Sequence, residues 1–184
     1  MRLTVLATRS SNTAGTQLGE IRLRAAGDGR GGRGDDVGVD VDLAGFRAAN
    51  PGGHSPPSEG PEKALAARGK WLDQSFREKG RSVLVLSAPE LVEVTGLALR
   101  TASDMPSRDP CRLLVEGSSS LSGAKWVPLF GGGSSSGSAS GSAQGGPCDL
   151  PMERKAWSKW LPLRPPGLAQ AVGEEEAAIP AAAA

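Results

Sequence analysis

Residues 70–126 decide the fold, and they contain Lys70-Trp71-Leu72-Asp73, Val83-Leu84-Val85-Leu86, Thr101-Ala102-Ser103-Asp104-Met105-Pro106-Ser107-Arg108-Asp109-Pro110, Leu114-Val115-Glu116-Gly117-Ser118 and Trp126. Most of the β-forming residues and two of the four tryptophans lie in this stretch. The continuous apolar run at 82–86 predicts a buried strand, because a strand covered on both faces has no polar side. Another strand is predicted at 112–116, where Gly and Ser residues follow and end it.

The sequence on either side of this stretch also alternates with the period of β-strands. Alternation predicts strands at 2–8, 17–24, 37–42, 90–101 and 125–130. Within 90–101 the apolar phase shifts by one residue at Gly96, which predicts a β-bulge. Trp71 and Trp126 are expected to be core anchors, since a large aromatic residue beside a buried strand more often packs inside than binds a ligand.

Tracts poor in packing residues divide the chain. We expect a β-sandwich over residues 1–130 that carries a flexible Gly-rich insertion at 27–36, followed by a Gly/Ser linker or long loop at 131–147. Residues 148–163 contain tryptophans and leucines again, so they are expected to pack on the sandwich. Trp157, Trp160 and Leu161 have helix-like spacing, but Pro151 and Pro162 limit any helix to about two turns. Residues 164–184 combine a Pro-Pro pair, three consecutive glutamates and an Ala run, which predicts a disordered tail.

Short strands with almost no helix are typical of an all-β protein. Roughly six to eight strands separated by turn signals predict a β-sandwich or jelly roll. Trp157 and Trp160 are expected to cover the open edge, because exposed paired tryptophans promote association.

The composition excludes some classes of function. The formal net charge is +1 and no aromatic residues interleave with the scattered basic ones, so no nucleic-acid partner is expected. No apolar run approaches the ~20 residues that span a bilayer. The first apolar residues are too few for a secretory signal, which leaves the cytoplasm as the default expectation. Cys111 and Cys148 are expected to be free thiols, with a disulfide left open, and with one histidine they make no zinc site.

The order of these motifs resembles that of discoidin (coagulation-factor type C) domains in the galactose-binding-like superfamily. The motifs are Gln17-Leu18-Gly19-Glu20-Ile21-Arg22-Leu23, Asn50-Pro51-Gly52-Gly53, Lys70-Trp71-Leu72-Asp73, Thr101-Ala102-Ser103-Asp104, Arg108-Asp109-Pro110, Glu116-Gly117-Ser118 and Trp126. The resemblance covers roughly residues 2–129, with a weaker echo at 149–154. It implies a sandwich that binds a glycan or another surface ligand through loops at one end. It also implies a closing strand near the C-terminal end, but here prolines and the acidic tail follow residues 155–163, so we expect the sandwich to lack a regular closing strand or to be closed by a poor substitute. The loop at 65–69 lacks the carboxylate found where such domains often hold calcium, so no metal site is expected.

Four residues are candidates for ligand binding: Asn50, His54, Asp104 and Arg108. Asn50 and His54 lie in a Gly- and Pro-rich loop, and loops carry binding residues more often than cores do. Asp104 and Arg108 lie in the turn after the central strands, where an arginine could bind a carboxylate or hydroxyls. The alternative for this turn is structural, with the aspartates capping turns and Arg108 paired with Asp104 or Asp109.

These observations predict a non-catalytic recognition module that binds carbohydrate or another surface ligand through loops at one end of the sandwich. No nucleophile, base and orienting group occur together, so no enzymatic activity, catalytic residue or cofactor is expected. The alternative is a structural or protein–protein interaction module, in which the apolar segment 157–163 docks a partner. The ligand would therefore be a glycan or a protein.

Overall fold

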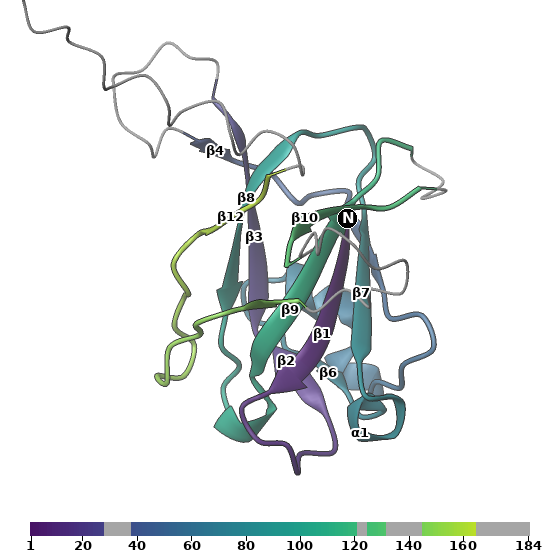
Figure 1. Cartoon of the computed structure of the whole chain (residues 1–184), viewed down its shortest axis with the longest axis vertical. Helices are drawn as coiled ribbons and strands as arrows, with labels where there is room; N and C mark the ends of the chain where they lie inside the picture. Colours follow the sequence, from purple (N-terminus) through teal and green to yellow (C-terminus); the bar gives the residue numbers. More distant parts are fainter. Residues whose placement is uncertain (28–37, 121–124, 132–144, 165–184) are drawn as a thin grey trace, which may run out of the picture.

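The computed structural model describes residues 1–27, 38–120, 125–131 and 145–164 (Figure 1). The predicted flexible insertion, linker and tail lie largely outside these described residues. None of the helices in the described part of the chain is long and apolar enough to cross a membrane.

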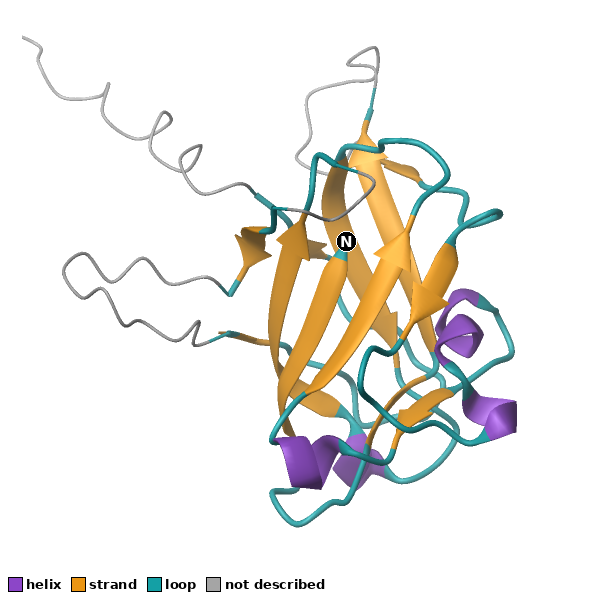
Figure 2. Ribbon diagram, turned by 90° about the vertical axis from the view of Figure 1, so that its right-hand side faces the viewer, coloured by secondary structure: helices purple, strands orange, loops and turns teal. Residues whose placement is uncertain are grey.

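Antiparallel strands dominate the described residues and form two stacked sheets, so the predicted all-β sandwich is confirmed (Figures 1 and 2). The first sheet has the order β10-β9-β1-β7-β5, with β11 also paired to β9. Its strands are β1 (Arg2–Thr8), β5 (Arg47–Ala49), β7 (Ser82–Ser87), β9 (Pro110–Gly117), β10 (Val127–Phe130) and β11 (Gly146–Pro147). The second sheet has the order β12-β8-β3-β4. Its strands are β3 (Glu20–Ala26), β4 (Gly38–Asp40), β8 (Val94–Arg100) and β12 (Leu161–Pro162).

The core lies between the two sheets and follows from the alternation of their strands. Successive side chains of a strand point to opposite faces, so Leu3 and Val5 of β1 face inward together. Ile21 and Leu23 do the same from β3 in the second sheet. The core residues that are at most 2% exposed on these central strands are Leu3, Val5, Ile21, Leu23, Leu84, Leu86, Leu97, Leu99, Leu113 and Val115.

A small third ladder closes the lower end of the molecule as drawn in Figure 1. It pairs β2 (Thr16–Leu18) with β6 (Trp71–Asp73). Trp71 is fully buried there, which confirms its predicted role as a core anchor. Short helical segments surround this end (Figure 2): η1 (Pro57–Glu59), η2 (Pro61–Leu65), α1 (Phe76–Lys79) and η3 (Pro106–Arg108).

The predicted irregularity at Gly96 is present in the second sheet. The register of β3 and β8 pairs Arg24 with Gly96 and then Ala25 with Val94, so β8 carries one extra residue there. The absence of a side chain at Gly96 also makes room for Trp160. A Cβ at this position would lie 3.3 Å from a ring atom of Trp160, so glycine lets the indole lie close against the sheet.

The C-terminal segment 145–164 packs on the sandwich without a helix, although the spacing of its tryptophans suggested one. The short strand β12 pairs with β8, so the sandwich is closed by a two-residue substitute for a regular strand. The guanidinium of Arg22 lies 4.1 Å from the ring centre of Trp157, and that of Arg24 lies 4.1 Å from that of Trp160. The tryptophans thus cover the outer face of the second sheet through cation–π contacts.

Trp126 does not pack between the sheets, and the prediction of a second core anchor is wrong. The residue directly precedes β10, at the edge of the first sheet, and is only partly buried. The guanidinium of Arg2 lies 4.7 Å from its ring centre, and the same arginine forms an ion pair with Glu116 at 2.6 Å. An edge position leaves the indole without a facing sheet, so it packs against a cation at the surface.

Candidate functional site

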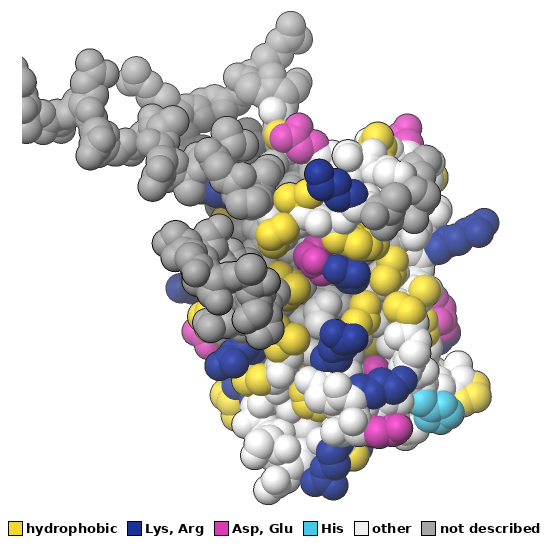
Figure 3. All heavy atoms as spheres, turned by 45° about the vertical axis from the view of Figure 1, so that its right-hand side comes forward, with side chains coloured by type: hydrophobic (Ala, Val, Ile, Leu, Met, Phe, Trp, Pro, Cys, Tyr) yellow, Lys and Arg dark blue, Asp and Glu magenta, His cyan; other side chains and the backbone are white. Residues whose placement is uncertain are grey.

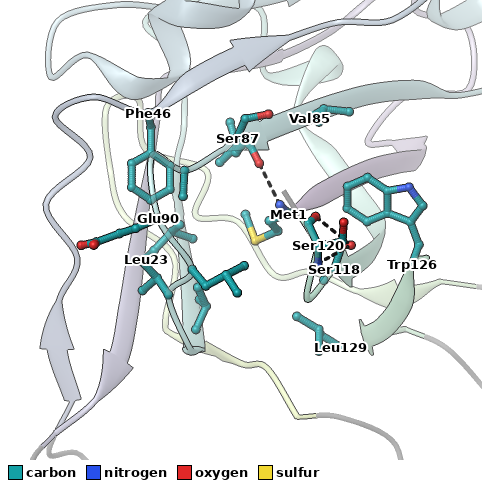
Figure 4. A pocket seen from close by; sticks show the side chains of 16 residues that line it. Met1, Leu23, Phe46, Val85, Ser87, Glu90, Ser118, Ser120, Trp126 and Leu129 are labelled. Carbon is teal, nitrogen blue, oxygen red and sulfur yellow. Dashed lines mark hydrogen bonds between the residues drawn. The ribbon is translucent and has the colours of Figure 1, made fainter. Parts of the chain in front are cut away.

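Two of the concave regions formed by the described residues lie at opposite ends of the sandwich. The upper one is an apolar pocket of about 190 Å³ where β1 begins and β7 and β9 end, with Phe46 and Trp126 on opposite sides (Figure 4). Glu90 is the one charged side chain among the described residues that line it. This volume is smaller than the roughly 300–1,000 Å³ of typical small-molecule sites, and the pocket offers few groups to orient a ligand.

The other region is a polar cleft of about 920 Å³, which we call the Lys70 cleft. Its walls come from Gly19, from the loop between η1 and β6 (residues 58–70), from residues 100–104 at the end of β8, and from Lys155. Four separate parts of the sequence therefore meet in one concavity. Binding residues are often arranged in this way, on loops held by a rigid scaffold.

Lys70 stands at the centre of the charged groups in this cleft. Its ammonium lies 2.9 Å from a carboxylate oxygen of Glu59 and 2.9 Å from one of Asp104. The lysine side chain is 14% exposed, whereas those of Glu59 and Asp104 are 26% and 47% exposed. The two carboxylates are thus fixed by one partly buried cation and still have free acceptor capacity toward solvent.

The bridge shifts the titration of Lys70 and Asp104. Burial disfavours the charged form of Lys70, but its hydrogen bonds to Asp104 and Glu59 outweigh burial, so its pKa is raised. Burial also opposes the charge of Asp104. The hydrogen bond from Lys70 and the charges of Lys70 and Arg108 outweigh that effect, so the pKa of Asp104 is lowered. The bridge therefore stays ionised over the whole neutral pH range.

Close backbone packing places Lys70 in the cleft. The chain turns back over η2 before β6, and the Gly69 N–H donates a hydrogen bond to the Ala66 carbonyl at 2.9 Å. A Cβ on Gly69 would lie 2.3 Å from the Lys63 carbonyl oxygen, so only glycine fits here. The buried Trp71 then fixes the direction of the strand that follows.

Two strained backbone positions border the cleft. Among the described residues, Met105 (φ 38°) and Lys155 (φ 61°) are the non-glycine residues with positive φ. Met105 directly follows Asp104, and Lys155 lines the cleft. The fully buried Gln17 holds the Asp104 turn, because its amide donates hydrogen bonds to the carbonyls of Asp104 at 2.6 Å and Met105 at 3.1 Å. Such strain persists only where surrounding structure enforces it, and it is concentrated at functional sites.

Of the four residues predicted from the sequence, the Lys70 cleft contains Asp104 alone. His54 is exposed, and its backbone N–H donates a hydrogen bond to Asp73 at 3.0 Å. The side-chain amide of Asn50 lies 3.5 Å from the Ser55 hydroxyl, within its own loop. Arg108 is partly buried in η3, and its carbonyl accepts a hydrogen bond from the Thr16 hydroxyl at 3.1 Å. The ligand-binding role of these residues stays a prediction.

The structural alternative for the turn named the wrong partners. Arg108 forms no ion pair with Asp104 or Asp109. Asp104 pairs with Lys70, and Asp109 pairs with Arg154 at 2.6 Å. Sequence reasoning missed both Lys70 and Lys155 as cleft residues. Lys70 was noted only as part of the motif Lys70-Trp71-Leu72-Asp73, and Lys155 belongs to no motif. Nowhere among the residues that the structure describes do three or more His, Cys, Asp or Glu side chains form a group that could hold a metal ion.

Comparisons with protein-family models, with curated proteins and with solved structures found no match to this chain. The class of protein that the fold defines is an all-β sandwich with a polar cleft at one end. The resemblance to discoidin domains therefore stays a prediction from the sequence motifs.

Replacing Lys70 with glutamine should raise the pKa of Asp104. Because the pKa of Asp104 is lowered in the folded protein, the bridge contributes its full stability at pH values above the ordinary pKa of 3.8. This contribution is lost as the pH falls through the lowered pKa. Without the ammonium, burial still raises the pKa of Asp104, while the hydrogen bond and the charge of Lys70 that lower it are gone. Carboxyl-carbon NMR titration of wild type and Lys70→Gln measures the shift. Lys79→Gln, at an exposed position outside the cleft, is the control, and an Asp104 titration unchanged by Lys70→Gln would show that the bridge does not form.

Proposed function

We propose that this chain is a non-catalytic recognition module that binds a carbohydrate in the Lys70 cleft. The observation that carries the proposal is the fixed pair of partly exposed carboxylates, Glu59 and Asp104, held by one lysine. Sugar hydroxyls are hydrogen-bond donors as well as acceptors, and ionised carboxylates accept two or more such bonds each. A rigid arrangement of acceptors lowers the entropic cost of binding a polar ligand.

The position and size of the cleft support the same proposal. Its volume of about 920 Å³ lies within the range of small-ligand sites and is enough for several sugar rings. It opens between loops at one end of a β-sandwich, where the motifs that resemble discoidin domains imply a ligand site. The two strained residues at its border, Met105 and Lys155, are a further sign that the local geometry serves binding.

A glycan array that carries neutral, carboxylated and sulfated oligosaccharides tests this proposal. We expect binding by the wild type, and a loss of at least tenfold in affinity for Asp104→Ala, as expected for losing a charge-assisted hydrogen bond worth about 1.5–3 kcal/mol. Asp149→Ala removes an exposed aspartate outside the cleft and should bind as the wild type does. Absence of binding to any glycan by a folded wild-type chain would refute carbohydrate recognition.

The segment 157–163 gives no separate support for a docking function. The faces of Trp157 and Trp160 contact Arg22 and Arg24 within the chain. Leu163 is 2% exposed and belongs to the core. The apolar groups that would meet a partner are therefore largely used to complete the sandwich.

A further inference from the structure

We propose that the carbohydrate bound in the Lys70 cleft is acidic, and that Arg68 and Lys155 bind its carboxylate or sulfate group. This inference rests on the proposed carbohydrate recognition, and it adds the charge of the ligand and the residues that select it. Hydroxyls of the same ligand would reach the carboxylates of Glu59 and Asp104. The ligand class is thus an oligosaccharide that combines hydroxyls with at least one anionic group.

Most charged side chains at the cleft are already paired within the chain. Lys70 is shared by Glu59 and Asp104, at 2.9 Å from each. Arg100 lies 2.7 Å from the carboxylate of Glu20, which is itself only 12% exposed. These groups have strong partners in the folded protein, so a ligand anion gains little by competing for them.

Arg68 and Lys155 differ from these paired groups. Both line the cleft, and neither forms an ion pair with any carboxylate in the part of the chain that the structure covers. Lys63, the remaining basic residue of the lining, lies 3.8 Å from Glu62. Arg68 and Lys155 are therefore the cations that a ligand anion can neutralise without breaking an existing contact. An arginine suits this role, because its planar guanidinium matches carboxylate and sulfate oxygens in a two-bond geometry.

Arg100 brings the backbone at these two cations together. Its guanidinium donates hydrogen bonds to the carbonyl of Ala67 at 2.7 Å and to the carbonyl of Lys155 at 3.1 Å. One side chain thus holds the backbone of Ala67, which directly precedes Arg68, and the backbone of Lys155 by hydrogen bonds. Lys155 is also held at φ 61°, a conformation that disfavours any residue with a Cβ. A strained backbone persists only where the surrounding structure enforces it, so the position of Lys155 beside the cleft is a fixed feature of the fold.

On the face drawn in Figure 3, Lys and Arg side chains lie among hydrophobic, uncharged and acidic ones. The chain as a whole carries a formal net charge of only +1. Attraction of an acidic ligand to the protein as a whole is therefore weak, and selection would come from the cleft. Binding should weaken as salt is raised, because partly exposed ion pairs are screened.

The test uses two matched ligand pairs and the full chain. One pair is tetragalacturonate and its methyl ester, and the other is a sulfated galactan oligosaccharide and its desulfated form. Titration calorimetry should give at least tenfold tighter binding for the charged member of a pair. Inorganic sulfate alone, titrated over the same range, should not bind, which separates an acidic carbohydrate from a simple anion site.

Lys155→Asn and Arg68→Gln are the variants that locate the selecting charges. Asparagine tolerates positive φ, so Lys155→Asn removes the charge and keeps the backbone. Each variant should lose about tenfold in affinity for the charged member and leave that for the neutral member unchanged. Arg81→Gln, exposed and outside the cleft, is the matched control. If both variants bound the charged ligand with wild-type affinity, Arg68 and Lys155 would not be the residues that bind its anionic group.

The outcomes for charge selection and for carbohydrate recognition are distinct. If the array shows binding to neutral glycans alone, or if both members of each pair bind equally, the ligand is not selected by charge, and carbohydrate recognition stands. If no glycan of any charge binds to the folded chain, both proposals fall. If inorganic sulfate binds as tightly as the sulfated oligosaccharide, the site recognises an anion and the proposed sugar contacts are wrong.

Discussion

Replacing Asp109 with alanine should destabilise the fold by about 3 kcal/mol, the lower part of the range for breaking a buried ion pair. The Asp109 side chain is 1% exposed and lies 2.6 Å from the guanidinium of Arg154, which bonds both of its oxygens. Arg9 lies 3.4 Å from the same carboxylate. Both arginines remain partly exposed, so water can solvate them after the change, which is why the lower part of the range applies.

The expected loss comes from the long-range role of this carboxylate. Arg9 stands at the end of β1 and also donates to the carbonyls of Leu150 and Pro151. Together with Arg154, it ties the C-terminal segment to the first sheet. Because Lys155 follows Arg154 directly, Asp109→Ala should also disturb the wall of the Lys70 cleft. It is expected to reduce binding there as well as stability.

Equilibrium unfolding by urea, followed by circular dichroism, measures this effect. Asp109→Asn keeps the shape and one acceptor oxygen, and it should cost less than Asp109→Ala. Asp149→Ala removes an exposed carboxylate of the same segment and should change stability by no more than about 0.5 kcal/mol. An Asp109→Ala protein as stable as Asp149→Ala would mean that the C-terminal segment is held by its apolar contacts alone.

Replacing Trp71 with alanine should cost about 3–5 kcal/mol, as for other large aromatic residues removed from a core. The side chain is fully buried within the hydrophobic cluster, and its strand β6 pairs with β2 at the lower end of the sandwich. Deleting the indole leaves a cavity that the paired strands cannot close. The loss should also loosen the loop that ends at Lys70, because the two residues are adjacent.

The comparison with Trp71→Phe shows whether packing or hydrogen bonding is responsible. The indole N–H of Trp71 has no hydrogen-bond partner in the described structure. Phenylalanine therefore loses no hydrogen bond and fills most of the space, so we expect a loss of only about 1–2 kcal/mol. Leu91→Ala, at a side chain that is 63% exposed, is the surface control. If urea unfolding showed that Trp71→Phe is less stable than Trp71→Ala, the packing argument would be contradicted.

Local patterns were sufficient to predict the longer strands but not the short strands β5, β6, β11 and β12. Period-two alternation predicted β1 and β3, the apolar run predicted β7, and the change of phase at Gly96 predicted the bulge of β8. These features depend on residues that are neighbours in the chain, because burial of one face of a strand makes apolar and polar residues alternate along it. The helix-like spacing of Trp157 and Trp160 was a poor guide, because the structure of this segment depends on residues that are remote in the sequence. The environment of the two tryptophans is set by Arg22 and Arg24, which lie far away in the sequence.

The candidate site could be predicted only in part. Asp104 was found because it lies in a turn with a recognisable motif. Lys70 and Lys155 were not, because their significance depends on where distant loops meet. The same holds for Arg154, whose partner Asp109 is 45 residues away in the sequence. Ion pairs of this kind have no local signature, since any acidic and any basic residue can form them once the fold brings them together.

The sequence by itself determined that this chain forms an all-β sandwich whose buried residues include Trp71, since strand periodicity and apolar runs are encoded locally. Only the tertiary structure decided that Trp126 stays at the surface, that Asp109 ties down the C-terminal segment, and that four separate parts of the sequence meet around Lys70. The physical reason is distance along the chain. Pairings between remote residues become favourable only after the core has fixed the loops in place.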